Sequence, residues 1–241
     1  MEDKNIGFVL KTIKYGESSL IVDFYSFKKG RISYITSVSK SKKGKIKRML
    51  FQPMTLLELE IKEYKKGLPR ITEGRIFEHL TSIPYHPVKS SITLFLAEFL
   101  AASIKEYEQN TPLFQFIFTS LLWLDKASSG FANFHLVFLI QLSRFVGIYP
   151  NTESYQEGAF FDLIEASFTN SKPLSHGSYL KEHEAKQIKT LERLNYNTMH
   201  LFKMGREDRR RILEVIIDFY TIHIPGFPEL KSVEVLKELF D

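Results

Sequence analysis

The feature that most constrains this chain is a series of five short segments, rich in β-branched and aromatic residues, within its first 80 residues. They cover residues 7–14, 19–26, 31–38, 55–62 and 70–77. In the fourth segment Leu57, Leu59 and Ile61 alternate with charged residues, which is typical of a strand with one buried face. Glycine-containing turns separate most of the segments. This pattern predicts a small closed barrel, and the OB-fold is a five-stranded barrel of this kind.

The pattern changes near Pro84 and Pro87, after which apolar residues recur at helical spacing. Thr111 followed by Pro112 predicts a helix N-cap with proline in the first turn. The expected helices cover residues 91–108, 111–126, 133–146, 182–194, 206–223 and 231–240. Residues 149–180 are richer in proline, glycine and asparagine, and they predict an irregular segment with a short hairpin around residues 159–169.

The predicted fold class is therefore α+β. An N-terminal five-stranded OB-fold barrel is followed by an all-helical domain with a small irregular or hairpin insertion. We expect the domain boundary near residue 80, with an OB-fold nucleic-acid-binding domain over residues 1–80 and a helical domain over residues 81–241.

Positive charge is concentrated in the predicted barrel. Residues 1–80 hold 17 lysines and arginines against 9 acidic residues, whereas residues 81–241 hold 16 against 19. Six of the nine positions from Lys40 to Arg48 are cationic, between the third and fourth predicted strands. A solvated surface loop would explain such a run. Cations that neutralise phosphates release counterions, however, and a basic loop on an OB barrel favours nucleic-acid binding.

Aromatic residues near these cations could stack on bases. Tyr15 and Tyr34 are the stronger candidates, whereas Phe24 is expected in the barrel core. The predicted DNA-binding residues are Lys28, Lys29, Arg31, Tyr34, Lys40, Lys42, Lys43, Lys45, Lys47 and Arg48. The arginines at 206 and 209–211 are interpreted as a solvated helix end.

Catalytic motifs are missing from the sequence. It has no Walker A, GxGxxG or GxSxG pattern, and His183-Glu184 lacks the second histidine of a zinc protease. The chain has no cysteine, which excludes disulfides, Cys-ligated zinc and iron–sulfur clusters. We therefore expect a non-enzyme without metal or cofactor. With no signal peptide or membrane span in view, a cytoplasmic, nucleoid-associated protein is expected.

Several short motifs occur together in a specific order. Residues 15–22 read YGESSLIV, 30–35 read GRISYI, 52–59 read QPMTLLEL and 67–71 read GLPRI. Further along, residues 146–150 read VGIYP, and residues 211–239 include His223 and the LKS run before the last predicted helix. In this order and spacing the chain resembles the bacterial DNA repair protein RecO family over nearly its whole length.

The resemblance implies an N-terminal OB-fold, binding to single- and double-stranded DNA, and annealing of complementary strands. It also implies partnership with RecR and single-strand binding protein, so that RecA can load. A partner's acidic tail would dock on the helical domain, with Arg144 as a candidate anchor. Many family members carry a four-cysteine zinc module after the motif at 146–150. Residues 151–179 lack cysteine, so zinc is not carried over and a zinc-free hairpin is expected instead.

The main hypothesis is a DNA-binding recombination mediator in DNA repair. Two alternatives stay open on the sequence: an RNA-binding OB-fold protein of translation or RNA processing, and an interaction scaffold that binds no nucleic acid. Competition between DNA and RNA oligonucleotides separates the DNA-binding mediator from the RNA-binding protein. A strand-annealing assay separates the mediator from the scaffold.

Overall fold

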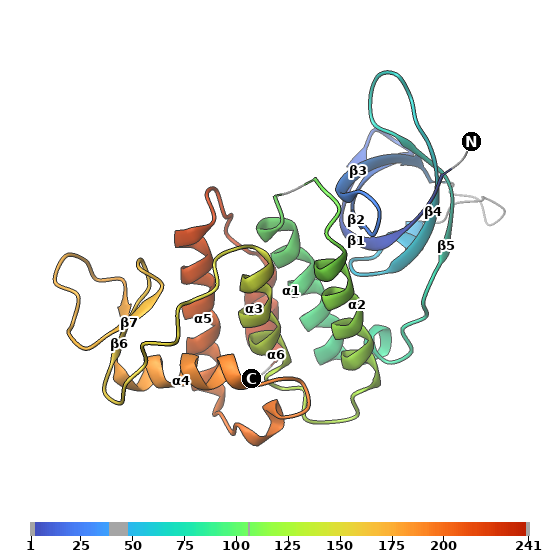
Figure 1. Cartoon of the computed structure of the whole chain (residues 1–241). Helices are drawn as coiled ribbons and strands as arrows, with labels where there is room; N and C mark the ends of the chain where they lie inside the picture. Colours follow the sequence, from blue (N-terminus) through green and yellow to red (C-terminus); the bar gives the residue numbers. More distant parts are fainter. Residues whose placement is uncertain (1–2, 39–47, 106, 240–241) are drawn as a thin grey trace. The chain divides into compact units, whose positions relative to one another are not determined.

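The computed structural model describes residues 3–38, 48–105 and 107–239. These residues form two compact units, one covering Met1–Asp125 with Leu230–Leu239 and the other covering Lys126–Glu229. The fold class is α+β, as predicted: an N-terminal five-stranded barrel and a helical region with a small sheet (Figure 1). No helix in these described ranges combines the length and apolar character that crossing a membrane requires.

Five strands close into the barrel. They are β1 (Asp3–Tyr15), β2 (Ser19–Ser26), β3 (Gly30–Ser37), β4 (Leu56–Lys62) and β5 (Arg70–Ile76). Their order around the barrel is β1-β2-β3-β5-β4, and only the β3–β5 pair is parallel. A register shift between Val9 and Lys11 lets β1 pair with β4 along its first part and with β2 along its last. This mixed barrel is the predicted OB-fold.

The barrel interior is filled by alternate residues of all five strands. The buried cluster contains Val9, Leu20, Val22, Phe24, Tyr34, Leu57, Leu59, Ile61 and Ile71. A 3₁₀ helix, η1 (Arg48–Phe51), adds the buried ring of Phe51 to this cluster. The alternation predicted for residues 57–61 is confirmed, because these three aliphatic side chains face the interior.

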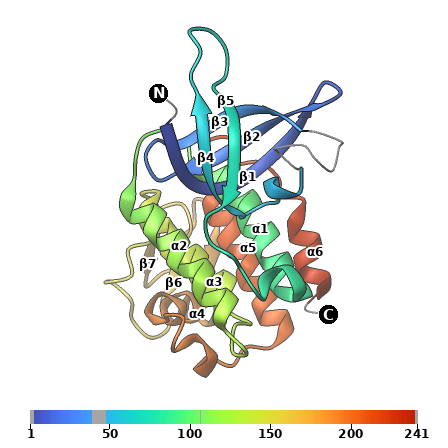
Figure 2. The same ribbon diagram turned by 90° about the vertical axis from the view of Figure 1, so that its right-hand side faces the viewer.

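Three helices belong to the same unit as the barrel: α1 (Pro87–Ser103), α2 (Thr111–Lys126) and α6 (Ser232–Leu239), with the 3₁₀ helix η2 (Ile83–Tyr85) before α1. In Figure 2 the barrel lies above them. α1 contacts both β1 and α6. The Glu98 carboxylate on α1 accepts the backbone N–H groups of Lys231 (3.1 Å) and Ser232 (2.8 Å), so it satisfies free donors at the start of α6.

The start of α2 differs from the prediction in one detail. Thr111 is the first helical residue rather than the N-cap. The Asn110 side chain accepts the backbone N–H of Leu113 at 3.0 Å, and its own carbonyl accepts the N–H of Phe114. Asn110 is therefore the capping residue, with Pro112 inside the first turn.

Phe114 of α2 joins the helices to the outer face of the barrel. Its ring centroid lies 4.8 Å from that of Phe8, 5.2 Å from Phe27 and 6.3 Å from Tyr25. Phe8 and Tyr25 alternate with Val9 and Phe24, which point inward. Both faces of β1 and β2 are consequently buried at this end of the barrel.

The turn between β2 and β3 fits closely against the segment after α1. Gly30 has a positive φ of 65°, and a Cβ added there would lie 2.0 Å from the carbonyl oxygen of Glu108. Only glycine satisfies both the backbone conformation and this close approach.

A buried polar network holds η2 against the end of α2. The Asp125 carboxylate accepts the backbone N–H groups of Thr81, Ser82 and Ile83, each at 2.8 Å. The Lys89 ammonium, also buried, donates to the Asp125 carbonyl at 3.0 Å. Burial by itself raises the pKa of the Asp125 carboxyl, but these hydrogen bonds outweigh it and hold the pKa below its ordinary value.

Asp125→Asn should lower the free energy of unfolding at neutral pH by about 2–3 kcal/mol, because an amide cannot replace all these bonds. Since the folded pKa is depressed, the carboxylate's stabilisation is fully present above about pH 4, the unfolded pKa, and is lost as the pH falls through the folded pKa. Urea unfolding measured across acidic pH checks this. Wild type and variant should converge below that range, and a constant gap would contradict it.

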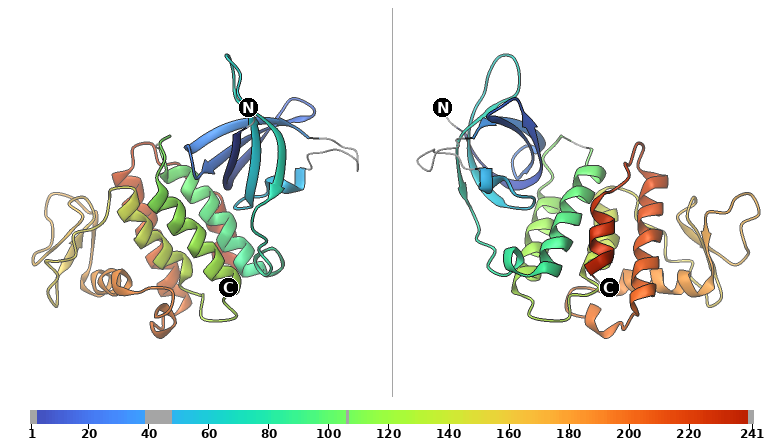
Figure 3. Two further views of the ribbon diagram at one scale, coloured as in Figure 1. Left: turned by 45° about the vertical axis from the view of Figure 1, so that its right-hand side comes forward. Right: turned by 180° about the vertical axis from the view of Figure 1, so that it is seen from behind.

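The second unit contains three helices and the small sheet: α3 (Phe134–Phe145), α4 (Glu182–Arg193), α5 (Arg206–His223), β6 (Phe160–Asp162), β7 (Ser167–Thr169) and β8 (Tyr179–Leu180), with the 3₁₀ helix η3 (Met199–Leu201) between α4 and α5. α3 packs against α4 and α5, and the sheet lies beside α5 (Figure 3). The predicted hairpin is confirmed as β6–β7. The sequence analysis missed β8, which pairs with β6 on its other side.

Candidate nucleic-acid interface

The most basic part of the predicted site lies outside the described residues. This applies to Lys40, Lys42, Lys43, Lys45 and Lys47. The chain leaves the barrel at Val38, whose backbone N–H donates to the Ser18 carbonyl at 2.8 Å. It returns at Arg48, which is exposed at the start of η1. Val38, the last described residue before the lysine-rich connection, therefore lies beside the β1–β2 turn.

Lys28 and Lys29 lie on the surface in the β2–β3 turn. Their backbone N–H groups donate to the Ser26 hydroxyl at 3.1 and 3.0 Å, which fixes the turn. The Lys29 ammonium lies 2.6 Å from the Glu63 carboxylate, and the two side chains are 37% and 57% exposed. An exposed pair of this kind contributes about 1 kcal/mol at most, so a phosphate can compete with Glu63 for Lys29.

The side chains of Arg31 and Tyr34 form hydrogen bonds within the protein. The Arg31 guanidinium contacts both carboxylate oxygens of Asp23, at 2.6 and 3.1 Å, and donates to the carbonyls of Ala101 and Ile104 at 2.6 Å. Tyr34 is fully buried, with its hydroxyl accepting a hydrogen bond from the Asn5 amide at 2.6 Å. In this arrangement Arg31 ties β3 to the end of α1, and the Tyr34 ring has no face open to a base.

An open cleft of about 540 Å³ lies at the end of the barrel where the β1–β2 turn and the β4–β5 loop meet. Its lining comes from β1, β2, β3, that loop and the start of β5: Tyr15, Ile21, Ile35, Tyr64, Lys66, Gly67, Leu68 and Arg70. We call this the barrel-end cleft. Tyr15, a stacking candidate from sequence, is exposed here, and so is Tyr64. Loops in these positions carry the oligonucleotide sites of OB-folds.

Cations line the barrel-end cleft and neighbour it in sequence. Lys66 and Arg70 are on its lining, and the exposed Lys14, Lys62 and Lys65 are within two residues of lining residues along the chain. The Lys62 ammonium lies over the Tyr64 ring, 5.9 Å from its centroid, and Arg70 donates to the Ser37 hydroxyl at 2.8 Å. The sequence analysis placed no site residue in the β4–β5 loop. The sequence KEYKK at residues 62–66, with one tyrosine among three lysines, is the pattern that could have predicted a site in this loop.

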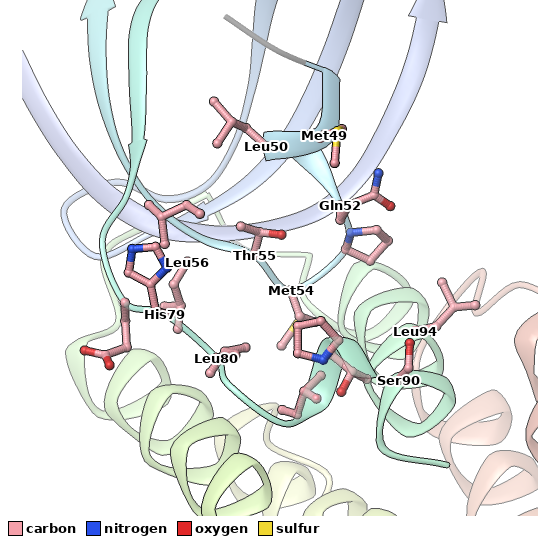
Figure 4. A pocket seen from close by; sticks show the side chains of 16 residues that line it. Met49, Leu50, Gln52, Met54, Thr55, Leu56, His79, Leu80, Ser90 and Leu94 are labelled. Atoms are coloured by element: carbon pink, nitrogen blue, oxygen red, sulfur yellow. The ribbon is translucent and has the colours of Figure 1, made fainter. Parts of the chain in front are cut away.

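A second cleft in the same unit has a different character. It occupies about 490 Å³ beside η1, the end of β5 and α1 (Figure 4). Aliphatic and methionine side chains make up most of its wall, including Met49, Leu56 and Leu94. Its titratable lining residues are Glu78 and His79. Among the described residues that line this cleft there is no lysine or arginine, and these residues suit apolar groups rather than phosphates.

Arg144, the predicted anchor for a partner, lies in the second unit at the end of α3. Its guanidinium lies 4.3 Å from the ring centroid of Tyr149 and donates to the tyrosine hydroxyl at 2.6 Å. Glu192 is 3.9 Å away and is itself bound by Lys189 at 3.0 Å. About half of the Arg144 side chain is exposed, so a partner's carboxylate can reach it but must compete with Glu192.

The residues around the small sheet do not fit the zinc site that many family members carry. The chain has no cysteine, and in the described ranges no three histidine or acidic side chains cluster so as to hold a metal. The sheet is instead packed with aromatic rings: the ring centroid of Phe168 lies 4.9 Å from that of Phe161 and 5.0 Å from that of Tyr155.

On α3, burial and the neighbouring Arg209 lower the pKa of His135 to about 3, so this histidine stays neutral.

The fold and the cationic barrel end define an OB-fold protein with a helical region, a class whose barrels bind oligonucleotides or oligosaccharides. Two family models match the chain: "Recombination protein O N terminal" over residues 1–80 and "Recombination protein O C terminal" over residues 85–233. The chain therefore belongs to the RecO family of DNA repair and recombination proteins. Members of this family are non-enzymatic proteins of recombination.

Similar proteins share the whole length of the chain. A DNA repair protein RecO of Bacteroides fragilis is 49% identical over 243 residues, and that of Phocaeicola vulgatus is 48% identical over 242. The RecO protein of Flavobacterium psychrophilum is 38% identical over 242 residues. In each case the alignment covers 100% of both chains.

Proposed function

We propose that this protein binds single- and double-stranded DNA through the cationic end of its barrel and anneals complementary strands during recombinational repair. The observation that supports this most is the exposed cations at one barrel end: Lys66 and Arg70 line the barrel-end cleft, and further exposed lysines are their neighbours in sequence. The lysine-rich sequence follows Val38, which lies beside the β1–β2 turn. Membership of the RecO family supports DNA as the nucleic acid.

Annealing needs no reactive group on the protein. Base pairing supplies the free energy, and the obstacle is the repulsion between two phosphate backbones. Exposed lysines that replace condensed counterions reduce this repulsion and hold the strands loosely. The long, mobile side chains of Lys65 and Lys66 suit such a role because they are not fixed to one geometry.

The family relationship also supports protein partners. We propose that the chain acts with RecR and with single-strand binding protein so that RecA loads on DNA, in a cytoplasmic, nucleoid-associated setting. The partly exposed Arg144 guanidinium is the proposed contact for an acidic tail of a partner. The domain division at residue 80 likewise stays a proposal.

Annealing of two complementary oligonucleotides, followed by fluorescence energy transfer, tests the central proposal. The full chain at low salt should accelerate duplex formation well above the uncatalysed rate, and the acceleration should fall steeply with added salt. A complementary RNA pair in the same assay separates DNA from RNA preference. No acceleration at low salt, or a clear preference for RNA, would contradict the proposal.

A further inference from the structure

The two ends of the barrel differ in how far their outer face is covered by a helix. Near α2, the outward-facing rings of Phe8 and Tyr25 are covered by Phe114 and are fully buried. At the other end, no helix in the described part of the chain packs over the outward-facing aliphatic residues. On β2, Leu20 and Val22 point into the core, so Ile21 between them points outward, and Ile35 on β3 does the same.

These aliphatic residues form a continuous row across the barrel. Ile13 on β1 is the direct strand partner of Ile21, which is the partner of Ile35, which in turn is the partner of Arg70 on β5. A strand face that meets water normally carries polar residues. Ile21 and Ile35 are partly exposed and line the barrel-end cleft, so they form its apolar floor. Ile13, about half exposed, continues the row on one side, and Arg70 ends it on the other.

Two exposed tyrosines also line the cleft. Tyr15 ends β1 and is 57% exposed, and Tyr64 lies near the start of the β4–β5 loop and is 48% exposed. Leu68 adds an apolar wall, while Lys66 and Arg70 place positive charge on the rim. An apolar floor, two exposed rings and a cationic rim match the parts of a nucleotide: the flat base and the phosphate.

We infer that the barrel-end cleft binds unpaired nucleotides, with bases stacked on Tyr15 and Tyr64 above the isoleucine floor and phosphates on Lys66 and Arg70. This inference rests on the proposed DNA-binding function and adds a basis for strand selection. In a duplex the base faces are already stacked on each other and cannot enter the cleft. The cleft therefore favours single strands, whereas the surrounding lysines bind either form of DNA.

The test compares three labelled probes by fluorescence anisotropy with the full chain: oligothymidylate, an abasic strand of equal length, and a blunt duplex. Tyr15→Ala and Tyr64→Ala should each weaken oligothymidylate binding about tenfold, because each removes the stacking of a base on an aromatic ring. Binding of the abasic strand and the duplex should stay unchanged, and so should the salt dependence. Tyr15→Phe and Tyr64→Phe should bind like wild type. Tyr85→Ala, which removes an exposed tyrosine from η2, is the matched control.

Three results would overturn the inference. If wild type binds the probes but the alanine variants bind oligothymidylate equally well, the cleft does not hold bases and the proposed function stands. If the variants weaken all three probes alike, with unchanged thermal unfolding, the tyrosines do not select single strands. If wild type binds no DNA at low salt, the proposed function fails together with the inference.

Discussion

Replacing Lys42, Lys43, Lys45 and Lys47 together with glutamate should weaken single-stranded DNA binding several hundred-fold at about 0.1 M salt. Each phosphate contact on a single strand contributes about 0.7 to the slope of log K against log salt concentration. Four lost contacts therefore remove about 2.8 from the slope, which is about 600-fold between 0.1 and 1 M salt. Anisotropy titrations over a range of salt measure both quantities. These lysines lie outside the described residues, so the prediction rests on the sequence.

A control with the same net charge distinguishes a local effect from a general one. The lysines at 172, 181, 186 and 203 are all exposed and belong to the unit that does not contain the barrel. Reversing these four charges changes the net charge by the same amount but should cost far less affinity. Equal losses in the two variants would show that overall charge, rather than the lysine-rich connection, governs binding.

Phe114→Ala should destabilise the unit that contains the barrel by about 3–5 kcal/mol, the usual cost of removing a buried phenylalanine. The ring is almost fully buried and meets three aromatic rings of the barrel, and each such ring pair contributes about 0.5–1.5 kcal/mol beyond the buried area. Alanine would leave a cavity between α2 and the outer face of β1 and β2. Guanidinium unfolding followed by circular dichroism measures the loss.

Gln115→Ala is the control, because this neighbour in α2 is exposed and its loss should change stability by less than about 0.5 kcal/mol. A fragment of residues 1–80 extends the test. Without α2 it exposes Phe8, Tyr25 and Phe27, so we expect it to be less stable than the barrel in the full chain or to aggregate. A loss below about 1 kcal/mol for Phe114→Ala, with a stable fragment, would support an independent barrel.

Much of the fold could be predicted from the sequence because the local patterns agree with the tertiary structure. The five strands were predicted to within a few residues, apart from an earlier start for β1, and α5 begins and ends at the predicted residues. The strand β8 could not be predicted, since two residues carry no periodicity and pair only because β6 lies beside them. The Asn110 cap was missed because Thr111 is an equally good capping residue by type.

The site was less predictable, because exposure depends on what covers each face of a strand. Tyr34 and Ile35 are neighbours on β3, and no local pattern indicates that the tyrosine is buried and the isoleucine partly exposed. Tyr34 faces inward because Asn5 from β1 supplies a buried partner for its hydroxyl. Arg31 was predicted from its charge alone, but its donors are used by Asp23 and by the end of α1, which lies 70 residues away in sequence.

The sheet of β6, β7 and β8 has a consequence for where its stability comes from. A module held by zinc folds only while the metal is supplied and its thiolates stay reduced, so chelators and oxidants unfold it. Here the contacts of Phe161, Phe168 and Tyr155 take that place, and the chain has no thiol to oxidise. The integrity of this sheet is set by temperature and by burial of its rings, independently of the cell's zinc supply or thiol balance.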